Sequence, residues 1–527
     1  MAELFPYGRN ASGLPDGLRC YETASEAMSV IADCPAETAV IYDAALHSSA
    51  LQIPESAAAK DDLSHAGLLL GGAGALGLSR FACLNWFLLN PNPNYRCASW
   101  RATPSLCMIR PETLRDLGGF DSAYESPAAR LMDYGFRLLS AGGRVSHDPA
   151  WLGSGPSMHK SDPIGLVDEF VFLLRHIGRL HAAWSAFWSP LAGVNPIAVW
   201  SAFGRARRRV RQNLRPIPSS GVVSSRLIGA EKRQEVRGIT AIIPTLNRYD
   251  YIARSIVSLL KQNPRPDEVI VVDQTPKERR QPEIYAPFEG PGFRVIYQDR
   301  PGQSTSRNAA IKEATGEWCL LWEDDTEAWD DLMQEHVRAV EYSGADASTG
   351  VSLAPWKTAE YIPEKKRHHQ LADVLATGNC LVRRDALLEV GGLDVAFNRG
   401  SGADHDLGTR LYLSGKEIVF NPKAIETHHK APSGGMRTYG AWWRNSTTWL
   451  SPYPPPTQVY TVRRYYPRQY WLPLYLLHFW TAAHRQQKFT ELMWLWMSAP
   501  WKLWRSTRAA SRLKTELGLL ADSRVGA

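Results

Sequence analysis

The segment that decides the fold is ITAIIPTLNRYDYIARSIVSLLKQNPRPDEVIVVD, residues 239–273 of a 527-residue chain. It opens with a short apolar run of β-forming residues that is closed by Pro244, and it ends with a second such run that stops at Asp273. Between them, apolar residues recur at helical spacing in YIARSIVSLLKQ. A strand, a helix and a second strand in this order predict a parallel α/β sheet.

The pattern continues with the strand-like runs RVIYQD (294–299) and EWCLLWED (317–324), separated by the helical segment RNAAIKEAT (307–315). In sheets of this kind, ligands bind beyond the carboxyl ends of the strands. Asp273 and the acidic run 323–325 both fall at strand ends. We therefore expect a nucleotide at this edge of the sheet.

The composition is that of a globular protein, with 44% apolar and 21% charged residues, and the length suggests two or three domains. The seven cysteines are odd in number and scattered, without a C-x-x-C pair, which argues against a disulfide framework or a zinc ribbon. The first ten residues, MAELFPYGRN, lack the basic and apolar regions of a signal peptide. We expect a cytoplasmic protein.

Basic residues are unevenly placed, with a run RARRRVRQNLR at 205–215 and further arginines after residue 460. No recognition helix, zinc finger or RNA-binding signature accompanies them, so we expect no nucleic-acid partner. From Ala441 onward the chain is rich in tryptophan, but no apolar run is long enough to span a bilayer. Interleaved Trp and Arg favour peripheral membrane contact at the inner face of the plasma membrane. The alternative is that these helices pack on the neighbouring domain.

The chain also contains an internal repeat. Residues 107–149 align without a gap on 380–422, with about thirteen of forty-three positions identical, and the segment 36–45 aligns more faintly on 316–325. Where the second copy has Asp324, Asp325 and Asp404, the first copy has Ala44, Ala45 and Leu131. We predict a truncated, degenerate and non-catalytic first copy that lacks any counterpart of residues 238–315.

Five motifs follow one another in the second copy: IIPTLNR (242–248), VVDQT (271–275), SRNAAIKEATGEW (306–318), LLWEDDT (320–326) and GGLDVAFNRGSGADHDLGTRL (391–411). In this order they resemble the inverting family-two glycosyltransferases, whose nucleotide-sugar-binding fold is called GT-A. The resemblance implies a GT-A-type α/β domain with a mostly parallel sheet, preceded by the degenerate copy and followed by aromatic-rich helices.

For the donor, the resemblance implies that Thr245 and Asp273 bind the base, where a carboxylate at a strand end can accept a hydrogen bond from a nucleobase N–H. Without the neighbouring motifs, Asp273 would be read as a turn former at a strand end. The other implied donor-binding residues are Pro244, Asn247, Arg248, Arg307, Asp324, Gly378 and Asn379.

For the metal, the clustered carboxylates that follow the strand suit Mn²⁺ or Mg²⁺. The resemblance implies Asp325 as a ligand, while Glu323 departs from a family pattern that usually has Asp there. A histidine is also implied after the last strand; we assign it to His428, although the sequence does not decide between His428 and His429. The alternative is that the acids cap the following helix, EAWDDLMQEHV.

For the reaction, the resemblance implies Asp404 as the base that takes the proton of the acceptor hydroxyl. Ala403 stands where the family usually has the first acid of a pair, and Asp406 is expected to orient its neighbours. The alternative is that these acids only cap the helix DLGTRLYLSG.

We expect a metal-dependent, inverting glycosyltransferase that uses a UDP-, dTDP- or GDP-sugar and a saccharide or lipid-linked saccharide acceptor, in cell-surface polysaccharide or glycolipid synthesis. An inactive nucleotide-binding scaffold is one alternative. A nucleotidyltransferase is another, although TLNRYDY is not the glycine- and basic-rich phosphate loop of that class. The expected parts are the degenerate copy, 1–160; helices and a basic linker, 161–236; the catalytic domain, 237–440; and aromatic, basic helices, 441–527.

Overall fold

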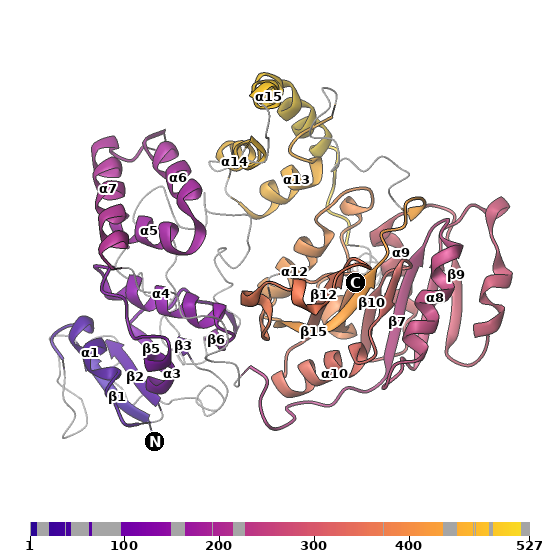
Figure 1. Cartoon of the computed structure of the whole chain (residues 1–527), viewed down its shortest axis with the longest axis horizontal. Coiled ribbons are helices and arrows are strands. Elements are labelled where there is room, and N and C mark those ends of the chain that lie inside the picture. Colours follow the sequence, from indigo (N-terminus) through magenta and orange to yellow (C-terminus); the bar gives the residue numbers. More distant parts are fainter. Residues whose placement is uncertain are drawn as a thin grey trace, which may run out of the picture. The chain divides into compact units, whose positions relative to one another are not determined.

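The computed structural model divides the chain into two compact units, which are taken one at a time below (Figure 1). The first comprises residues 1–229 with 363–371 and 412–415, and the second comprises the rest. The described residues are 2–7, 21–36, 38–43, 63–65, 96–148, 164–191, 193–213, 227–372, 374–435, 451–466, 468, 471–483 and 489–517.

The second unit is built on one sheet with the strand order β11-β15-β12-β14-β10-β7-β8-β9. The pairs β10–β7, β7–β8, β8–β9 and β12–β15 are parallel, whereas β14 runs antiparallel to β10 and β12. This mostly parallel α/β sheet confirms the predicted fold class. The strands are β7 (Ile239–Thr245), β8 (Glu268–Asp273), β9 (Phe293–Tyr297), β10 (Trp318–Trp322), β11 (Thr326–Ala328), β12 (Ala347–Leu353), β14 (Asn379–Arg383) and β15 (Ile418–His428); β13 (Gln370–Leu371) belongs to segment 363–371.

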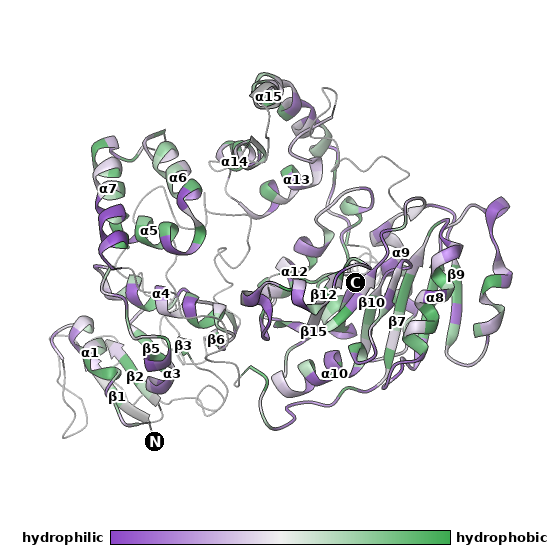
Figure 2. Cartoon of the chain, in the orientation of Figure 1, coloured by the Kyte–Doolittle hydropathy of each residue, from purple (hydrophilic) through white to green (hydrophobic). Residues whose placement is uncertain are grey.

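Helices cover both faces of this sheet because its central strands are apolar on both sides, as the green β7 and β10 in Figure 2 show. Along β7, Ala241 and Ile243 pack toward α8 and α10, whereas Ile242 packs toward α9, α11 and α12. Two cores therefore sandwich the sheet and fix where its strands end. The helices are α8 (Tyr249–Leu260), α9 (Gln303–Glu313), α10 (Leu332–Ser343), α11 (Arg384–Glu389) and α12 (Ala403–Leu413).

The first unit contains a smaller sheet with the order β1-β2-β5-β3-β6-β4. Its first five strands match β7-β10-β14-β12-β15 of the second unit in order and in direction. The elements are β1 (Ala2–Tyr7), α1 (Ala24–Ile31), β2 (Thr38–Asp43), β3 (Leu63–His65), β4 (Cys97–Ala98), β5 (Leu106–Ile109), α3 (Pro111–Asp116), α4 (Pro127–Ser140) and β6 (Val145–His147).

This topology corrects one expectation from the sequence. The first copy was expected to lack any counterpart of residues 238–315, but β1 lies parallel to β2 as β7 lies parallel to β10. The sequence of β1 is too unlike that of β7 for the repeat to be visible there. Among the described residues, the first unit has no strands that correspond to β8 and β9. Ala44 and Ala45 lie outside the described residues.

The two units also share side-chain contacts at aligned positions. In α4 and in α12, a buried aspartate forms an ion pair with an arginine one turn later. The distance is 2.8 Å between Asp133 and Arg137, and 2.9 Å between Asp406 and Arg410. Each arginine donates to two backbone carbonyls of the preceding turn. The acceptors are Leu117 and Gly119 for Arg137, and Val390 and Gly392 for Arg410.

A group of helices follows each sheet. After the first sheet come α5 (Leu166–Phe172) with a π-helical turn (Leu173–Ile177), α6 (Arg179–Leu191) and α7 (Pro196–Gln212). After the second come α13 (Pro456–Tyr465), α14 (Trp471–Ala483) and α15 (Phe489–Ala510). We call these two groups the helical appendages. Within the described residues, no helix is long and apolar enough to cross a membrane.

In each unit, two aspartates at aligned positions bind the helical appendage that follows the sheet, and we call them the aspartate clamp. In the second unit, Arg464 of α13 lies 2.6 Å from Asp394 and 3.0 Å from Asp406. In the first unit, Asp121 lies 2.9 Å from Arg175 and Asp133 lies 2.8 Å from His176. All four aspartates are almost fully buried. Each appendage is therefore fixed by buried charge pairs rather than attached loosely.

Replacing Arg464 by Met should destabilise the second unit strongly, because Asp394 would stay buried without its cation and Asp406 would keep only Arg410. Breaking a buried pair in this way costs about 3–5 kcal/mol. The thermal midpoint and the hydrogen exchange of α13 would report the loss. The neighbouring substitution Arg463→Met, which removes contacts to the Tyr475 hydroxyl and the Trp471 ring but to no buried carboxylate, should cost much less. Equal losses in both variants would contradict the clamp.

His336 should make the second unit sensitive to acid. Its ring is fully buried between Ser348 and Asn379, at 2.9 Å from each, and burial lowers its pKa from 6.5 to about 4. His336 binds a proton more readily in the unfolded chain than in the folded one. The free energy of unfolding is therefore highest above pH 6.5 and falls as the pH decreases toward 4. Between pH 7.5 and 5 this loss is about 2 kcal/mol. Urea titrations at both pH values should show this loss. In the His336→Gln variant, the part of the loss that is due to His336 should disappear. An unchanged pH dependence would refute it.

Candidate active site

A cavity of about 260 Å³ opens in the second unit at the carboxyl ends of β7, β8 and β10. This is the edge where the sequence places the nucleotide. Six of the predicted donor- and metal-binding residues line it: Pro244, Thr245, Arg248, Arg307, Asp324 and His428. The other lining residues are Leu246, Gln274, Gln303, Glu323, Asn398, Arg399, Gly400 and Gly435.

Strand register brings the histidine to the acidic turn. The buried strand β10 ends at Trp322, so residues 323–325 form the turn that follows it. The next strand, β11, pairs antiparallel with the end of β15, with Thr326 opposite His428. Residues that are about one hundred positions apart in the sequence therefore meet at one corner of the sheet.

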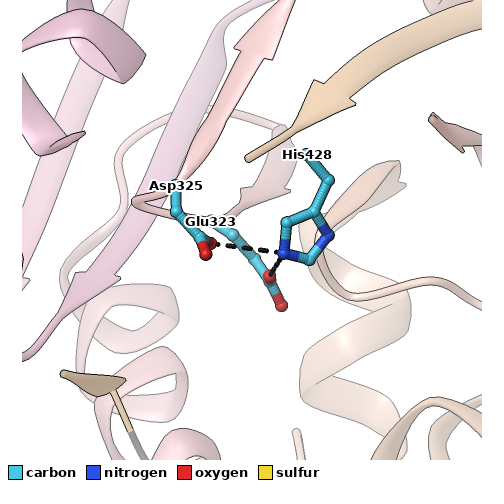
Figure 3. A group of neighbouring side chains, drawn as sticks. All are labelled: Glu323, Asp325 and His428. Atoms are coloured by element: carbon cyan, nitrogen blue, oxygen red, sulfur yellow. Dashed lines mark ion pairs between the residues drawn. The ribbon is translucent and has the colours of Figure 1, made fainter. Parts of the chain in front are cut away.

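Glu323, Asp325 and His428 form a cluster whose ligand atoms all lie within 4.8 Å of one another (Figure 3). His428 Nε2 is 3.5 Å from Asp325 Oδ1 and 3.8 Å from Glu323 Oε2. It is the only cluster of this kind among the described residues. His429 points elsewhere, with its Nε2 2.7 Å from Glu327. Of the two histidines, only His428 therefore lies with the acidic turn, and its role as a metal ligand stays a prediction.

The cluster has the chemistry that a divalent cation needs. Two carboxylates and an imidazole suit Mn²⁺ or Mg²⁺ in the presence of further oxygen ligands. Asp325 Oδ2 accepts a hydrogen bond from the Ala431 amide at 2.8 Å, whereas the buried Oδ1 lacks a well-aligned hydrogen bond among the described residues. That oxygen faces His428 and Glu323. The residues present therefore fit a cation held by Glu323, Asp325 and His428.

Arg248 balances the charge of the two aspartates. Its Nη1 lies 2.7 Å from Asp324 and 3.2 Å from Asp325. Asp324 also accepts a hydrogen bond from Thr245 at 2.8 Å. Burial raises the pKa of Asp324 to about 6 in spite of Arg248. Burial acts to raise the pKa of Asp325 too, but His428 and Arg248 outweigh it and hold that pKa at about 2. Asp325 is the more strongly ionised of the pair.

A glycine turn at 434–435 closes the site behind Arg248. A Cβ atom on Gly435 would lie 2.7 Å from the guanidinium, and both glycines adopt positive φ, so a larger residue would be strained and would displace Arg248. The Gly435 amide donates to Leu246 O at 2.8 Å, and Ser433 O accepts from Arg248 Nε at 3.2 Å. Sequence reasoning missed this turn, although SGG directly after the histidines is a turn signal.

Arginines surround the carboxylates at the cavity. Arg307 is buried, lies 3.6 Å from Glu323, and donates to the Thr377 carbonyl. Gly378, a predicted donor residue, packs against Glu323, and a Cβ atom on this glycine would lie 3.0 Å from the glutamate side chain. Arg399 is exposed at the rim. Together with Arg248, these cations make the cavity suitable for an anion such as a diphosphate.

Asp404 stands in the first turn of α12 and accepts hydrogen bonds from the hydroxyl and the amide of Thr377, at 2.5 and 3.2 Å. It does not line the cavity. Its role as the base stays a prediction. Asp406 is fully buried and binds Arg410 and Arg464, which agrees with the orienting role expected for it.

Besides Gly378, three predicted donor residues do not line the cavity. Asp273 is fully buried and accepts from Tyr249 and Tyr285 at 2.7 and 3.0 Å. The Asn379 side chain binds His336 inside the core. Asn247 adopts a positive φ, and its backbone amide donates a hydrogen bond to Thr275 Oγ1. Donor binding by these three residues stays a prediction.

Another part of the cavity lining, formed by Gln303, Asn398 and Gly400, was also missed. Asn398 Oδ1 accepts from the amides of Ser304 and Thr305, at 2.9 and 3.0 Å, and so caps the start of α9. Gln303 Nε2 donates to the carbonyls of Phe397 and Gly400. These bonds fix the loop before α12 against the first turn of α9. A lone Asn–Arg–Gly in the sequence gives no sign of a partner ninety residues away.

Comparisons of sequence agree with this site. Residues 240–387 match the family described as Glycosyl transferase family 2. The uncharacterized protein y4gI of Sinorhizobium fredii is 27% identical over 228 residues, 37% of this chain and 25% of that protein. The succinoglycan biosynthesis protein ExoO of Rhizobium meliloti is 30% identical over 112 residues, 21% of this chain and 32% of that protein. The chain thus spans about a third or less of the length of these relatives.

Solved structures resemble the chain more distantly. The mannosyltransferase PcManGT of Pyrobaculum calidifontis, in complex with GDP-Man and Mn²⁺, is 16% identical with a TM-score of 0.35, over 57% of this chain and 81% of that one. TarS 1–349 of S. aureus is 16% identical with a TM-score of 0.36, over 52% and 82%. The segment 240–387, which matches the glycosyl transferase family 2, supplies the ends of β7, β8 and β10 that border the cavity.

Proposed function

We propose that this chain is an inverting, metal-dependent glycosyltransferase that moves a sugar from a nucleotide-sugar donor to an acceptor hydroxyl. The observation that carries the proposal is the cluster of Glu323, Asp325 and His428 beside Arg248 and Arg307 at the cavity. A sugar transferase must neutralise a departing diphosphate, and a cation beside fixed guanidinium groups does so. The match of residues 240–387 to the family supports the same activity.

Each group has a task in this proposal. Asp325 and His428, with Glu323, would hold Mn²⁺ or Mg²⁺, which acts as a Lewis acid on the diphosphate when bound. Arg248 and Arg307 add fixed positive charge on the same side.

The remaining predicted donor contacts belong to the base, the ribose and the donor sugar. They are Pro244, Thr245, Asn247, Asp273, Asp324, Gly378 and Asn379.

Asp404 is proposed as the general base. The acceptor oxygen forms its bond to the anomeric carbon while the bond from that carbon to the diphosphate oxygen breaks on the opposite face. The acceptor proton passes to Asp404, and the electron pair leaves with the nucleoside diphosphate. The hydrogen bonds from Thr377 support this role, because they fix the carboxylate at the start of α12.

The proposed donor is a UDP-, dTDP- or GDP-sugar, and the proposed acceptor is a saccharide or a lipid-linked saccharide. The name of the rhizobial relative, a succinoglycan biosynthesis protein, supports a role in polysaccharide synthesis. Acceptors of this kind favour a location at the inner face of the plasma membrane.

We further propose that the first unit is a degenerate copy of the second. The shared strand order and the aligned Asp–Arg contacts support this view. Leu131, which aligns with the proposed base, is fully buried. The described residues of the first unit contain no metal-binding cluster. The proposed parts are 1–160 for this copy, 161–236 for helices and linker, 237–440 for the catalytic domain, and 441–527 for the last helices.

The substitution Asp325→Ala should abolish metal-dependent binding of nucleoside diphosphates, because it removes the buried carboxylate of the cluster. Calorimetry with UDP, dTDP and GDP, each with and without Mn²⁺, would measure this. The exposed Asp330→Ala, a few residues along the chain, is the control and should bind like the wild type. A wild-type protein that binds none of these nucleotides with Mn²⁺ would refute the proposed donor site, and binding without turnover would favour the scaffold.

The substitution Asp404→Asn should lower kcat by about a hundredfold to ten-thousandfold while nucleotide binding persists, since a general base acts only on the acceptor. Transfer can be followed by product mass with a panel of nucleotide sugars and saccharide acceptors. His405→Gln changes the exposed neighbour on the same turn and should leave kcat unaltered. Full activity in the Asp404 variant would assign the base elsewhere.

A further inference from the structure

The last helix of each helical appendage presents the same kind of surface to solvent. Most of the large apolar side chains that stay exposed among the described residues belong to the two appendages. In an ordinary soluble protein such side chains are scattered, and their concentration in one kind of element marks an interaction site.

In α15 the exposed side chains form one stripe. Met493, Met497, Trp501, Trp504 and Arg508 follow one another at steps of three or four residues, so they share one face of the helix. Met497 is 68% exposed, and the two tryptophans are 48% exposed each. The rings of Trp501 and Trp504 stack at 5.0 Å, and the Arg508 guanidinium lies 5.4 Å from the Trp504 ring. Apolar side chains and a cation thus form one continuous strip.

The opposite face of α15 is already used for packing. Leu495 and Ala499 are buried against Phe479 of α14. Lys502 and Ser506 are also buried on this side, where the Ser506 hydroxyl donates to the Pro454 carbonyl. The helix is therefore held with its tryptophan face outward, and it cannot hide that face by turning about its axis without breaking these contacts.

In α7 the layout is the same. Ile197 and Trp200 are exposed at 81% and 53%, and Arg208 and Arg211 lie on the same face further along the helix, at steps of three or four residues through Gly204. Val199, Ala202 and Ala206 fill the opposite, buried face. Figure 2 shows the change along α7 from green and white turns to purple ones. Both helices therefore run from an apolar exposed half to a basic exposed end.

The charges favour one kind of partner. The sequence of α7 contains no acidic residue, and that of α15 contains only Glu491, in its first turn. Exposed tryptophans beside arginines, without acids, suit the headgroup zone of a bilayer that carries negative lipids. A protein that binds only the exposed apolar side chains would not require arginines without acidic residues on the same helix.

We propose that α7 and α15 are interfacial helices, each of which lies along the surface of an anionic lipid bilayer with its Trp-bearing face in the headgroup region. The surface has been duplicated together with the sheet, because the aspartate clamp that fixes each appendage is duplicated as well. The inference does not rest on the proposed transferase activity, since membrane binding can be measured in the absence of donor and acceptor.

Flotation of the full-length protein with phosphatidylcholine vesicles, with and without phosphatidylglycerol, tests this inference. The wild type should float with the anionic vesicles and much less with the neutral ones, and salt near about 1 M should weaken its binding by shortening the Debye length to about 3 Å. The double substitution Trp501→Ser/Trp504→Ser should weaken binding by about tenfold or more through loss of apolar contact. Arg208→Gln/Arg211→Gln should weaken it by up to roughly thirtyfold through loss of two charges.

Matched controls are the exposed Trp356→Ser and Arg265→Gln, which lie outside both appendages. They should float like the wild type, and the thermal midpoints of all variants should agree because every changed side chain is exposed. A wild type that ignores anionic vesicles, or controls that lose as much binding as the helix variants, would overturn the inference. The inference would also be overturned if light scattering showed that the tryptophan variants only dissociate an oligomer. The Trp-bearing face of α15 would then be an interface between copies of the chain.

Discussion

Asp324 and Asp325 are consecutive, buried carboxylates, and the site depends on the single guanidinium that lies between them. Arg248 reaches both from the start of α8, at 2.7 and 3.2 Å. Without it, two negative charges at the end of an apolar strand would repel each other and lose their hydration. The glycine turn at 434–435 follows from the same contact, because only residues without a side chain leave room for the guanidinium. One arginine therefore sets the shape of the segment that closes the site.

The two units share a buried contact that maintains the fold, but they differ at the position of the proposed base. The Asp133–Arg137 and Asp406–Arg410 pairs occupy aligned positions, and in both units the arginine ties the helix to the glycine turn before it. This contact persists although the first unit has Leu131 where the second has Asp404. The buried ion pair is thus present in both units, whereas the residue proposed as the base is present only in the second.

Local pattern was enough to predict the strands and the edge at which they end. Apolar runs closed by Asp273 and by Glu323 placed the acids at carboxyl ends of parallel strands, and the cavity lies there. Partners that are distant in the sequence could not be predicted. His428 meets Asp325 through the register of β11 and β15, which no short motif encodes. Asn379 binds His336 in the core for the same reason, so a residue that resembles a donor contact has its side chain engaged elsewhere.

The clamp on the second appendage holds the loop before α12, and part of this loop lines the cavity. Asp394 and Asp406 lie on either side of the segment that carries Asn398, Gly400 and Asp404, and Arg464 binds both aspartates at once. The same segment is fixed at its other side by the bonds between Asn398 and the first turn of α9. A loop held at both edges can keep a side chain in place without being part of the sheet. The last helices therefore support the loop before α12 through Asp394 and Asp406, although none of their described residues lines the cavity.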